Sequence, residues 1–200
     1  MQTDALINEL AARAEPVAEG TVARRLGIVL FIGLIAAMSI QLLTVGPRAD
    51  LDMAWLAVLA KVSVCVAIAA VWLRYLKSLS APGQPTKLRS IIAIVTIAAA
   101  IPLAAMAAYD FAGLSRCVHQ VLMLSIPALL GFQWVLSKSA PTQPMRAGFA
   151  LGVAAGSIGA FAYALGCQVD TPNDVAFRYG GAILATGLLG ALLGKLTLKW

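Results

Sequence analysis

The sequence predicts an all-α polytopic membrane protein with six transmembrane helices and a short cytoplasmic N-terminal helix. Two observations indicate this class. Hydrophobic residues make up 60% of the 200-residue chain and charged residues only 12%, which is too little charge to cover a soluble domain. The apolar residues also form runs of about 20 residues, the length that a helix needs to cross the hydrocarbon core. Open strands are excluded there, because lipid offers no partner for their backbone groups.

Six apolar runs reach this length, and connections rich in proline or glycine separate several of them. The predicted spans are residues 26–45, 54–76, 90–109, 118–137, 147–166 and 177–195. We therefore divide the chain into an N-terminal tail, residues 1–25, and a transmembrane bundle, residues 26–200. Glycines recur every four residues in the last two spans, which predicts faces for close helix packing rather than a pore lining. These glycines are Gly148, Gly152 and Gly156, followed by Gly190 and Gly194.

Lysine and arginine predict the orientation of the chain, because cytoplasmic loops are enriched in both. With a cytoplasmic N-terminus, eleven basic residues lie on the cytoplasmic side and three on the other. The eleven are Arg13, Arg24, Arg25, Arg74, Lys77, Lys87, Arg89, Lys138, Arg146, Lys195 and Lys199, and the three are Arg48, Arg116 and Arg178. An even number of spans then places both termini in the cytoplasm. This bias explains the net charge of +6 without a nucleic-acid partner, for which we find no motif.

The tail has the pattern of a short amphipathic helix. Leu6, Ile7, Leu10 and Ala11 form one apolar face at helical spacing, and Asp4 lies where a cap or the helix dipole favours an acid. A helix this short is marginal in water and becomes stable when its apolar face docks. It either lies against the membrane or its own bundle, or docks into a groove on a soluble protein. Its acidic polar face favours the protein partner, since membrane-surface helices are usually basic.

Two cysteines are expected at the same face of the membrane. Cys117 opens the fourth span and Cys167 closes the fifth, and a short connection makes these spans antiparallel neighbours. Three interpretations remain open: a structural disulfide, a redox switch in which Arg116 activates Cys117, and a sensor for soft metals or thiol-reactive oxidants with His119 as an accessory ligand. The Cys-x-His spacing defines no particular metal site, so no metal ligand is firmly predicted.

Lys61 is the one charge well inside a predicted span. An intramembrane lysine is costly and is therefore a candidate functional group. The favoured interpretation is a structural ion pair with Asp110 as a candidate partner, and outward snorkelling is the alternative. No Ser/His/Asp set, P-loop or HExxH pattern occurs, so the sequence indicates neither an enzyme nor a cofactor.

Several segments follow one another in an order and spacing typical of one family. They are TDALINELAARAEPV and RRL in the tail, then GPRADL, Lys61, Cys117, SAPTQPMRAG, GAFAYALGC and GALLGKLTLKW. Through these segments the whole chain resembles the NrsF-type anti-sigma factors, six-helix inner-membrane proteins that hold an extracytoplasmic-function sigma factor of the sigma-F type. It departs from the family pattern at Gly166, where a histidine is expected, and at Lys195-Leu196, where Pro-Arg is expected.

The resemblance implies that the protein lies among the lipids of the bacterial inner membrane and regulates transcription under stress. It implies that the tail helix binds and sequesters the sigma factor. The tail residues concerned are Asp4, Leu6, Ile7, Leu10 and Ala11. The resemblance also implies that Cys117 and Cys167 are the family's paired cysteines, which are needed for the response to metals or oxidants such as chromate or cadmium. His119 and Lys61 remain accessory candidates.

A small inner-membrane transporter or permease is the alternative function. Three-plus-three inverted repeats would place polar residues at mid-membrane in both halves of the chain. Lys61 lies in the first half, and the second half has no matching charge. This asymmetry favours the binding and signalling protein.

Overall fold

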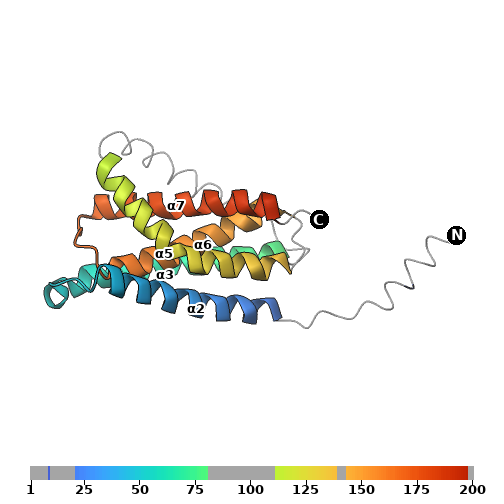
Figure 1. The fold of residues 1–200 in the computed structure, drawn as a ribbon, viewed down its shortest axis with the longest axis horizontal. Coiled ribbons are helices and arrows are strands. Elements are labelled where there is room, and N and C mark those ends of the chain that lie inside the picture. The colour runs from blue at the N-terminus through green and yellow to red at the C-terminus, as the bar shows by residue number, and fades with distance from the viewer. Residues whose placement is uncertain (1–8, 10–20, 81–110, 139–142, 198–200) are drawn as a thin grey trace.

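The computed structural model describes residues 9, 21–80, 111–138 and 143–197, and every regular element in these ranges is an α-helix (Figure 1). The helices are α2 (Thr21–Thr44), α3 (Leu51–Ser80), α5 (Phe111–Ser137), α6 (Pro144–Ala164) and α7 (Pro172–Thr197). All five are long and apolar enough to cross a membrane. They coincide with five of the six predicted spans. The predicted span 90–109 lies outside the described residues, and so do the five candidate sigma-binding residues of the tail.

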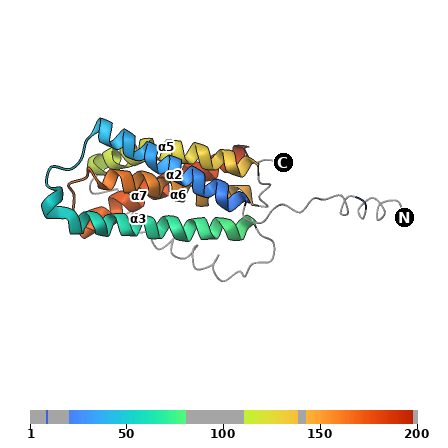
Figure 2. The ribbon, with the colours of Figure 1, turned by 90° about the horizontal axis from the view of Figure 1, so that it is seen from below.

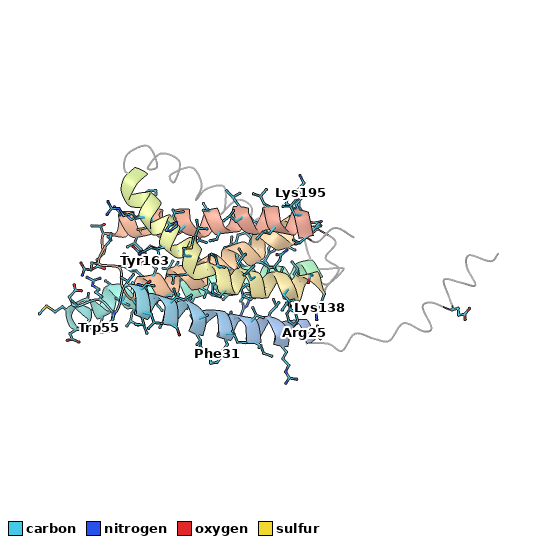
Figure 3. All side chains as sticks on the ribbon, in the orientation of Figure 1. Arg25, Phe31, Trp55, Lys138, Tyr163 and Lys195 are labelled. Atoms are coloured by element: carbon cyan, nitrogen blue, oxygen red, sulfur yellow. The ribbon has the colours of Figure 1, made fainter. Side chains whose placement is uncertain are left out.

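The helices lie lengthwise beside one another and give the bundle two different ends (Figures 1 and 2). At one end, which we call the cysteine end, α2 and α6 finish and α3, α5 and α7 begin. Trp55 and Tyr163 lie toward this end in Figure 3. Arg25, Lys138 and Lys195 lie at the other end, which we call the basic end. The charged residues therefore separate along the bundle as the sequence predicts.

Helix α6 occupies the centre of the described bundle. It contacts α2, α3, α5 and α7 (Figure 2). In its most apolar stretch of 18 residues, 83% of the residues are buried. Its sequence, PMRAGFALGVAAGSIGAFAYA, consists largely of glycine and alanine. In a membrane, helices associate through close packing rather than through exclusion of water, so small side chains suit a central helix.

Glycines bring the backbones of α6 and α7 into direct contact. A Cβ atom at Gly148 would overlap the carbonyl oxygen of Gly190, and one at Gly190 would overlap the carbonyl oxygen of Gly148. Gly152 lies in the same way against the carbonyl oxygen of Thr186. The predicted close-packing faces of the fifth and sixth spans are thus confirmed. Gly159, which the pattern did not include, allows a similar approach to Val121 of α5.

Packing is looser on the side of α6 that faces α2 and α3. An apolar cavity of about 200 Å³ lies between these three helices. Leu34 of α2, Cys65 and Ala69 of α3, and Ile158 of α6 contribute to its wall. The bundle therefore has one tight helix pair and a less tightly packed neighbouring side.

Gly152→Ala should destabilise the bundle by about 1–3 kcal/mol, because the added methyl group forces α6 and α7 apart. Thermal unfolding in detergent measures this as a lower Tm. Gly27→Ala is the matched control, since no atom lies within 4 Å of a Cβ placed there. An equal loss of stability in both variants would contradict the assignment of close packing to Gly152.

Candidate functional site

Four charged residues form a network at the cysteine end, which we call the charge cluster: Arg48, Asp50, Lys61 and Asp170. Lys61 Nζ lies 2.7 Å from Asp170 Oδ1, and Arg48 Nη2 lies 2.6 Å from Asp170 Oδ2. Arg48 also donates to Asp50 through Nε and, at 2.8 Å, through Nη2. The Arg48 and Lys61 side chains are 4% and 3% exposed, whereas the Asp170 side chain is 34% exposed. Asp170 therefore neutralises two buried cations from the edge of the bundle.

The end of α2 places Arg48 in this network. Val45 and Gly46 both donate their backbone N–H groups to the carbonyl oxygen of Gln41, which ends the helix. Gly46 has φ +81°, in the left-handed region that glycine adopts without a steric penalty. The chain then turns back, and the N–H of Arg48 donates to Leu165 O at 3.1 Å. A glycine turn thus joins the α2–α3 connection to the end of α6.

Lys61 reaches the same point from α3. Lys61 lies about three turns after the start of the helix, and its side chain is buried. Its Nζ donates to Asp170 and also to the carbonyl oxygen of Cys167, at 3.3 Å. Arg48 Nη1 donates to the same carbonyl at 3.2 Å. A buried ammonium requires such partners, because an unpaired charge in a low-dielectric environment costs several kcal/mol.

The cations keep both carboxylates of the charge cluster ionised. Hydrogen bonds from Arg48 and then from Lys61 lower the pKa of Asp170 below its ordinary value of 3.8. Arg48 likewise lowers the pKa of Asp50, and Asp170 is the main cause that raises the pKa of Arg48. A carboxyl with a lowered pKa stabilises the fold above its ordinary pKa and loses this effect as the pH falls toward its pKa in the folded protein. The charge cluster is therefore intact across neutral pH.

The two predicted sensor cysteines approach one tyrosine. Cys117 and Cys167 are free thiols, each 4% exposed. Cys117 Sγ lies 3.3 Å from the Tyr163 hydroxyl, and Cys167 belongs with Tyr179 to a buried cluster against which Tyr163 packs. The two tyrosine rings are 5.8 Å apart between centroids. The structure thus brings both cysteines to the same end of the bundle and places Tyr163 beside each of them.

The other candidates do not join the thiols. Arg116 and His119 are exposed, whereas Cys117 between them on α5 is buried. In the part of the chain that the structure describes, no group of three or more His, Cys, Asp or Glu side chains could hold a metal ion. Lys61 forms an ion pair, as favoured, but its partner among the described residues is Asp170. Asp110, the partner considered from the sequence, lies outside those residues.

Gly166, the departure from the expected family histidine, faces the side chain of Gln41. A Cβ atom at Gly166 would overlap Gln41 Nε2 and lie 3.2 Å from Gly46 O. Gln41 is 1% exposed, and its Nε2 has no hydrogen-bond partner among the described residues. The Gln41 side chain therefore occupies space that a larger residue at position 166 would need.

Sequence reasoning missed Arg48, Asp170 and Tyr163 as members of this site. The available signal for Asp170 was the need of a lysine within a span for a carboxylate at similar depth, together with the few acids in the connections at this end. Tyr163 lies within an apolar run, where an aromatic residue gives no separate signal. The site becomes visible only in the three-dimensional structure, where the end of α6 lies beside the α2–α3 and α6–α7 connections.

The five long apolar helices of the fold are those of a multi-pass membrane protein. The chain belongs to the NrsF family, whose model, described as negative regulator of sigma F, matches residues 10–200. It is 32% identical over 214 residues to the anti-sigma-F factor NrsF of Caulobacter vibrioides (strain NA1000 / CB15N), with 100% of both chains covered. It is 30% identical over 213 residues to a probable anti-sigma-F factor NrsF of Azospira oryzae (strain ATCC BAA-33 / DSM 13638 / PS), again with 100% of both chains covered. No solved structure matches the chain.

These comparisons confirm the family resemblance found in the sequence. Membership implies that the protein is an anti-sigma factor and that a sigma factor is its partner.

Asp170→Asn should lower the free energy of unfolding by about 1–3 kcal/mol at neutral pH, because Lys61 loses its carboxylate while Arg48 keeps Asp50. The difference from wild type should stay constant between about pH 5 and 8 and shrink below about pH 4, because Asp170 then takes up a proton in the unfolded chain before it does so in the folded protein. Thermal unfolding in detergent at several pH values measures both effects. Asp52→Asn, which removes an exposed carboxyl in the first turn of α3, is the control and should lower the Tm only slightly, through the helix dipole. A difference that varies between pH 5 and 8 would contradict the lowered pKa of Asp170.

Proposed function

We propose that this anti-sigma factor sequesters an extracytoplasmic-function sigma factor of the sigma-F type through residues 1–25. A metal or oxidant signal at Cys117 and Cys167 then releases the sigma factor. The observation that carries the sensor proposal is the convergence of two buried free thiols on Tyr163 at the cysteine end. The printed names of the two relatives support the sigma-factor partner.

We also propose six spans in the bacterial inner membrane, with both termini in the cytoplasm. The basic end, which carries Arg25, Lys138 and Lys195, would face the cytoplasm, where basic residues are enriched. Helix α3 ends at the basic end and α5 begins at the cysteine end (Figure 1). A crossing by the predicted span 90–109 accounts for this change of side. The thiols would then face the oxidising side of the membrane.

The thiol chemistry requires a change in the contacts of Tyr163. Joining Cys117 and Cys167 in a disulfide removes two protons and two electrons, which the oxidant accepts. A soft metal would instead bind the two thiolates after they lose their protons. In either case the Cys117 sulfur loses its proton and can no longer donate to the Tyr163 hydroxyl, so we expect the packing between α5 and α6 to adjust. This adjustment is the proposed first step of release.

The transporter alternative gains no support from Lys61. Its ammonium donates to Asp170 and to the Cys167 carbonyl at the cysteine end, and both contacts hold it there. The binding and signalling function therefore remains the one that the geometry favours.

Leu10→Asp in the tail should abolish capture of the sigma factor, because a charge on the apolar face of the tail helix opposes its docking. Co-purification of the full chain with candidate sigma factors measures capture. Asn8→Asp adds the same charge off the apolar face and should retain capture. Removal of residues 1–20 should give the same loss as Leu10→Asp. Full capture of the sigma factor by Leu10→Asp or by the chain without residues 1–20 would exclude this helix as the binding element.

Cys117→Ser and Cys167→Ser should each abolish release of the sigma factor by metals or oxidants and leave its capture intact. A reporter gene driven by the sigma factor measures release, and co-purification measures capture. Cys65→Ser is the matched control, because Cys65 is a third buried free thiol that has no part in the proposed mechanism. A normal response in both single variants would sink the sensor proposal without affecting sigma-factor capture.

A further inference from the structure

We propose that Arg48, Lys61 and Asp170 act as a latch that keeps the Cys167 thiol covered and thereby controls its access to reagents. The proposal assigns these residues a positioning role at the thiol site, to which the family comparison gives no residue. The contacts involve Cys167 itself. Arg48 Nη1 and Lys61 Nζ both donate to the carbonyl oxygen of Cys167, at 3.2 and 3.3 Å.

The same two cations hold the chain again three residues later. Asp170 accepts from Lys61 at 2.7 Å and from Arg48 at 2.8 Å and 2.6 Å. The segment 167–170 is therefore fastened at both ends to a lysine of α3 and an arginine of the α2–α3 connection. Neither cation belongs to α6 or α7, so the latch links two separate parts of the bundle.

Cys167 is buried although the segment that carries it lies near the surface. Helix α6 ends at Ala164 and α7 begins at Pro172, so the residues between them have no helix to hold them. Gln168 and Asp170 are exposed, whereas Cys167 is 4% exposed. The backbone N–H of Cys167 donates to Tyr163 O at 3.1 Å, which restrains the start of the segment. Beyond that point, the two cations hold the segment together with Val169, which is half-buried and packs against the core.

Opening the segment would break these contacts together. The ion pairs with Asp170 and the two hydrogen bonds to the Cys167 carbonyl share the same cations, so the loss of one weakens the others. Lys61 would also lose its carboxylate while still largely buried, which makes the open state costly. Reagents that need an exposed thiol react through such local opening, at a rate set by its free energy.

The latch also gives thiol chemistry a way to alter the bundle. A reaction at Cys167 that requires the open segment favours the open state, and reciprocally the closed latch disfavours the reaction. This regulatory meaning rests on the proposed thiol sensor. The control of access does not, because it concerns only the covering of Cys167.

The test uses the full chain in native membranes with Cys65→Ala and Cys117→Ser, so that Cys167 is the one remaining thiol. The rate of labelling by a hydrophilic maleimide reports its exposure. Asp170→Asn should accelerate labelling by about tenfold or more, because two cations lose their shared carboxylate. Asp52→Asn, which removes a carboxyl outside the charge cluster, should leave the rate unchanged.

A second variant keeps the test decisive if Asp170→Asn does not fold. Lys61→Met removes one cation but leaves Asp170 bound to Arg48, so the expected acceleration is smaller, about threefold. A parallel chain with Cys65 as the one remaining thiol, labelled by a membrane-permeant maleimide, reports loosening of the helix packing around the cavity between α2, α3 and α6. Its rate should not change in either variant.

Faster labelling of Cys167 with unchanged labelling of Cys65 supports the latch. Wild-type labelling of Cys167 in the folded variants overturns it, and so does equal acceleration at both thiols, which would indicate general destabilisation. Labelling needs neither a sigma factor nor a signal. Failure of the latch is therefore distinguishable from failure of the proposed function, which co-purification and the reporter gene measure separately.

Discussion

The arrangement at the cysteine end depends on the pairing of Lys61 with Asp170. A lysine in an apolar helix must find a carboxylate and further acceptors, because the alternative is an unpaired charge in a low-dielectric environment. Asp170 meets this need from the α6–α7 connection, and Arg48 shares the same carboxylate. The requirement therefore fixes where that connection runs, and with it the position of Cys167. The buried charge of Lys61 thus accounts for the positions of the α2–α3 and α6–α7 connections and of Cys167.

Helix α6 supplies the frame in which this pairing takes place. Its small residues allow four neighbouring helices to approach, and Tyr163 near its end is one of the few large side chains on it. Tyr163 stands beside Cys117 from α5 and Cys167 from the following connection. The central helix thus holds the thiol site from one side while the charge cluster holds it from the other. The packing contact of Tyr163 and the ion pairs of Asp170 are therefore close to each other in the sequence.

The sequence predicted the elements of this bundle better than the contacts between them. Span lengths follow from the thickness of the bilayer, and the glycine spacing of residues 148–156 follows from helical geometry, so both could be read from residue order. The partner of Lys61 could not, because it depends on a glycine turn at Gly46 that brings Arg48 and Leu165 together. Sequence topology placed Cys117 and Cys167 at one face, but it could not show the contact of Cys117 with Tyr163. That detail depends on the rotation of α5 and α6 about their own axes.

The backbone contact between α6 and α7 has a mechanical consequence. Two helices joined at Gly148 and Gly190 without intervening side chains resist sliding and separation, so we expect them to move as a single rigid body. The cavity beside α2 and α3 leaves those helices freer to tilt. Arg48 and Lys61 belong to this freer part, whereas Asp170 follows α6. The charge cluster therefore joins the two parts across the boundary between them, so a tilt of one part against the other would change its ion-pair distances.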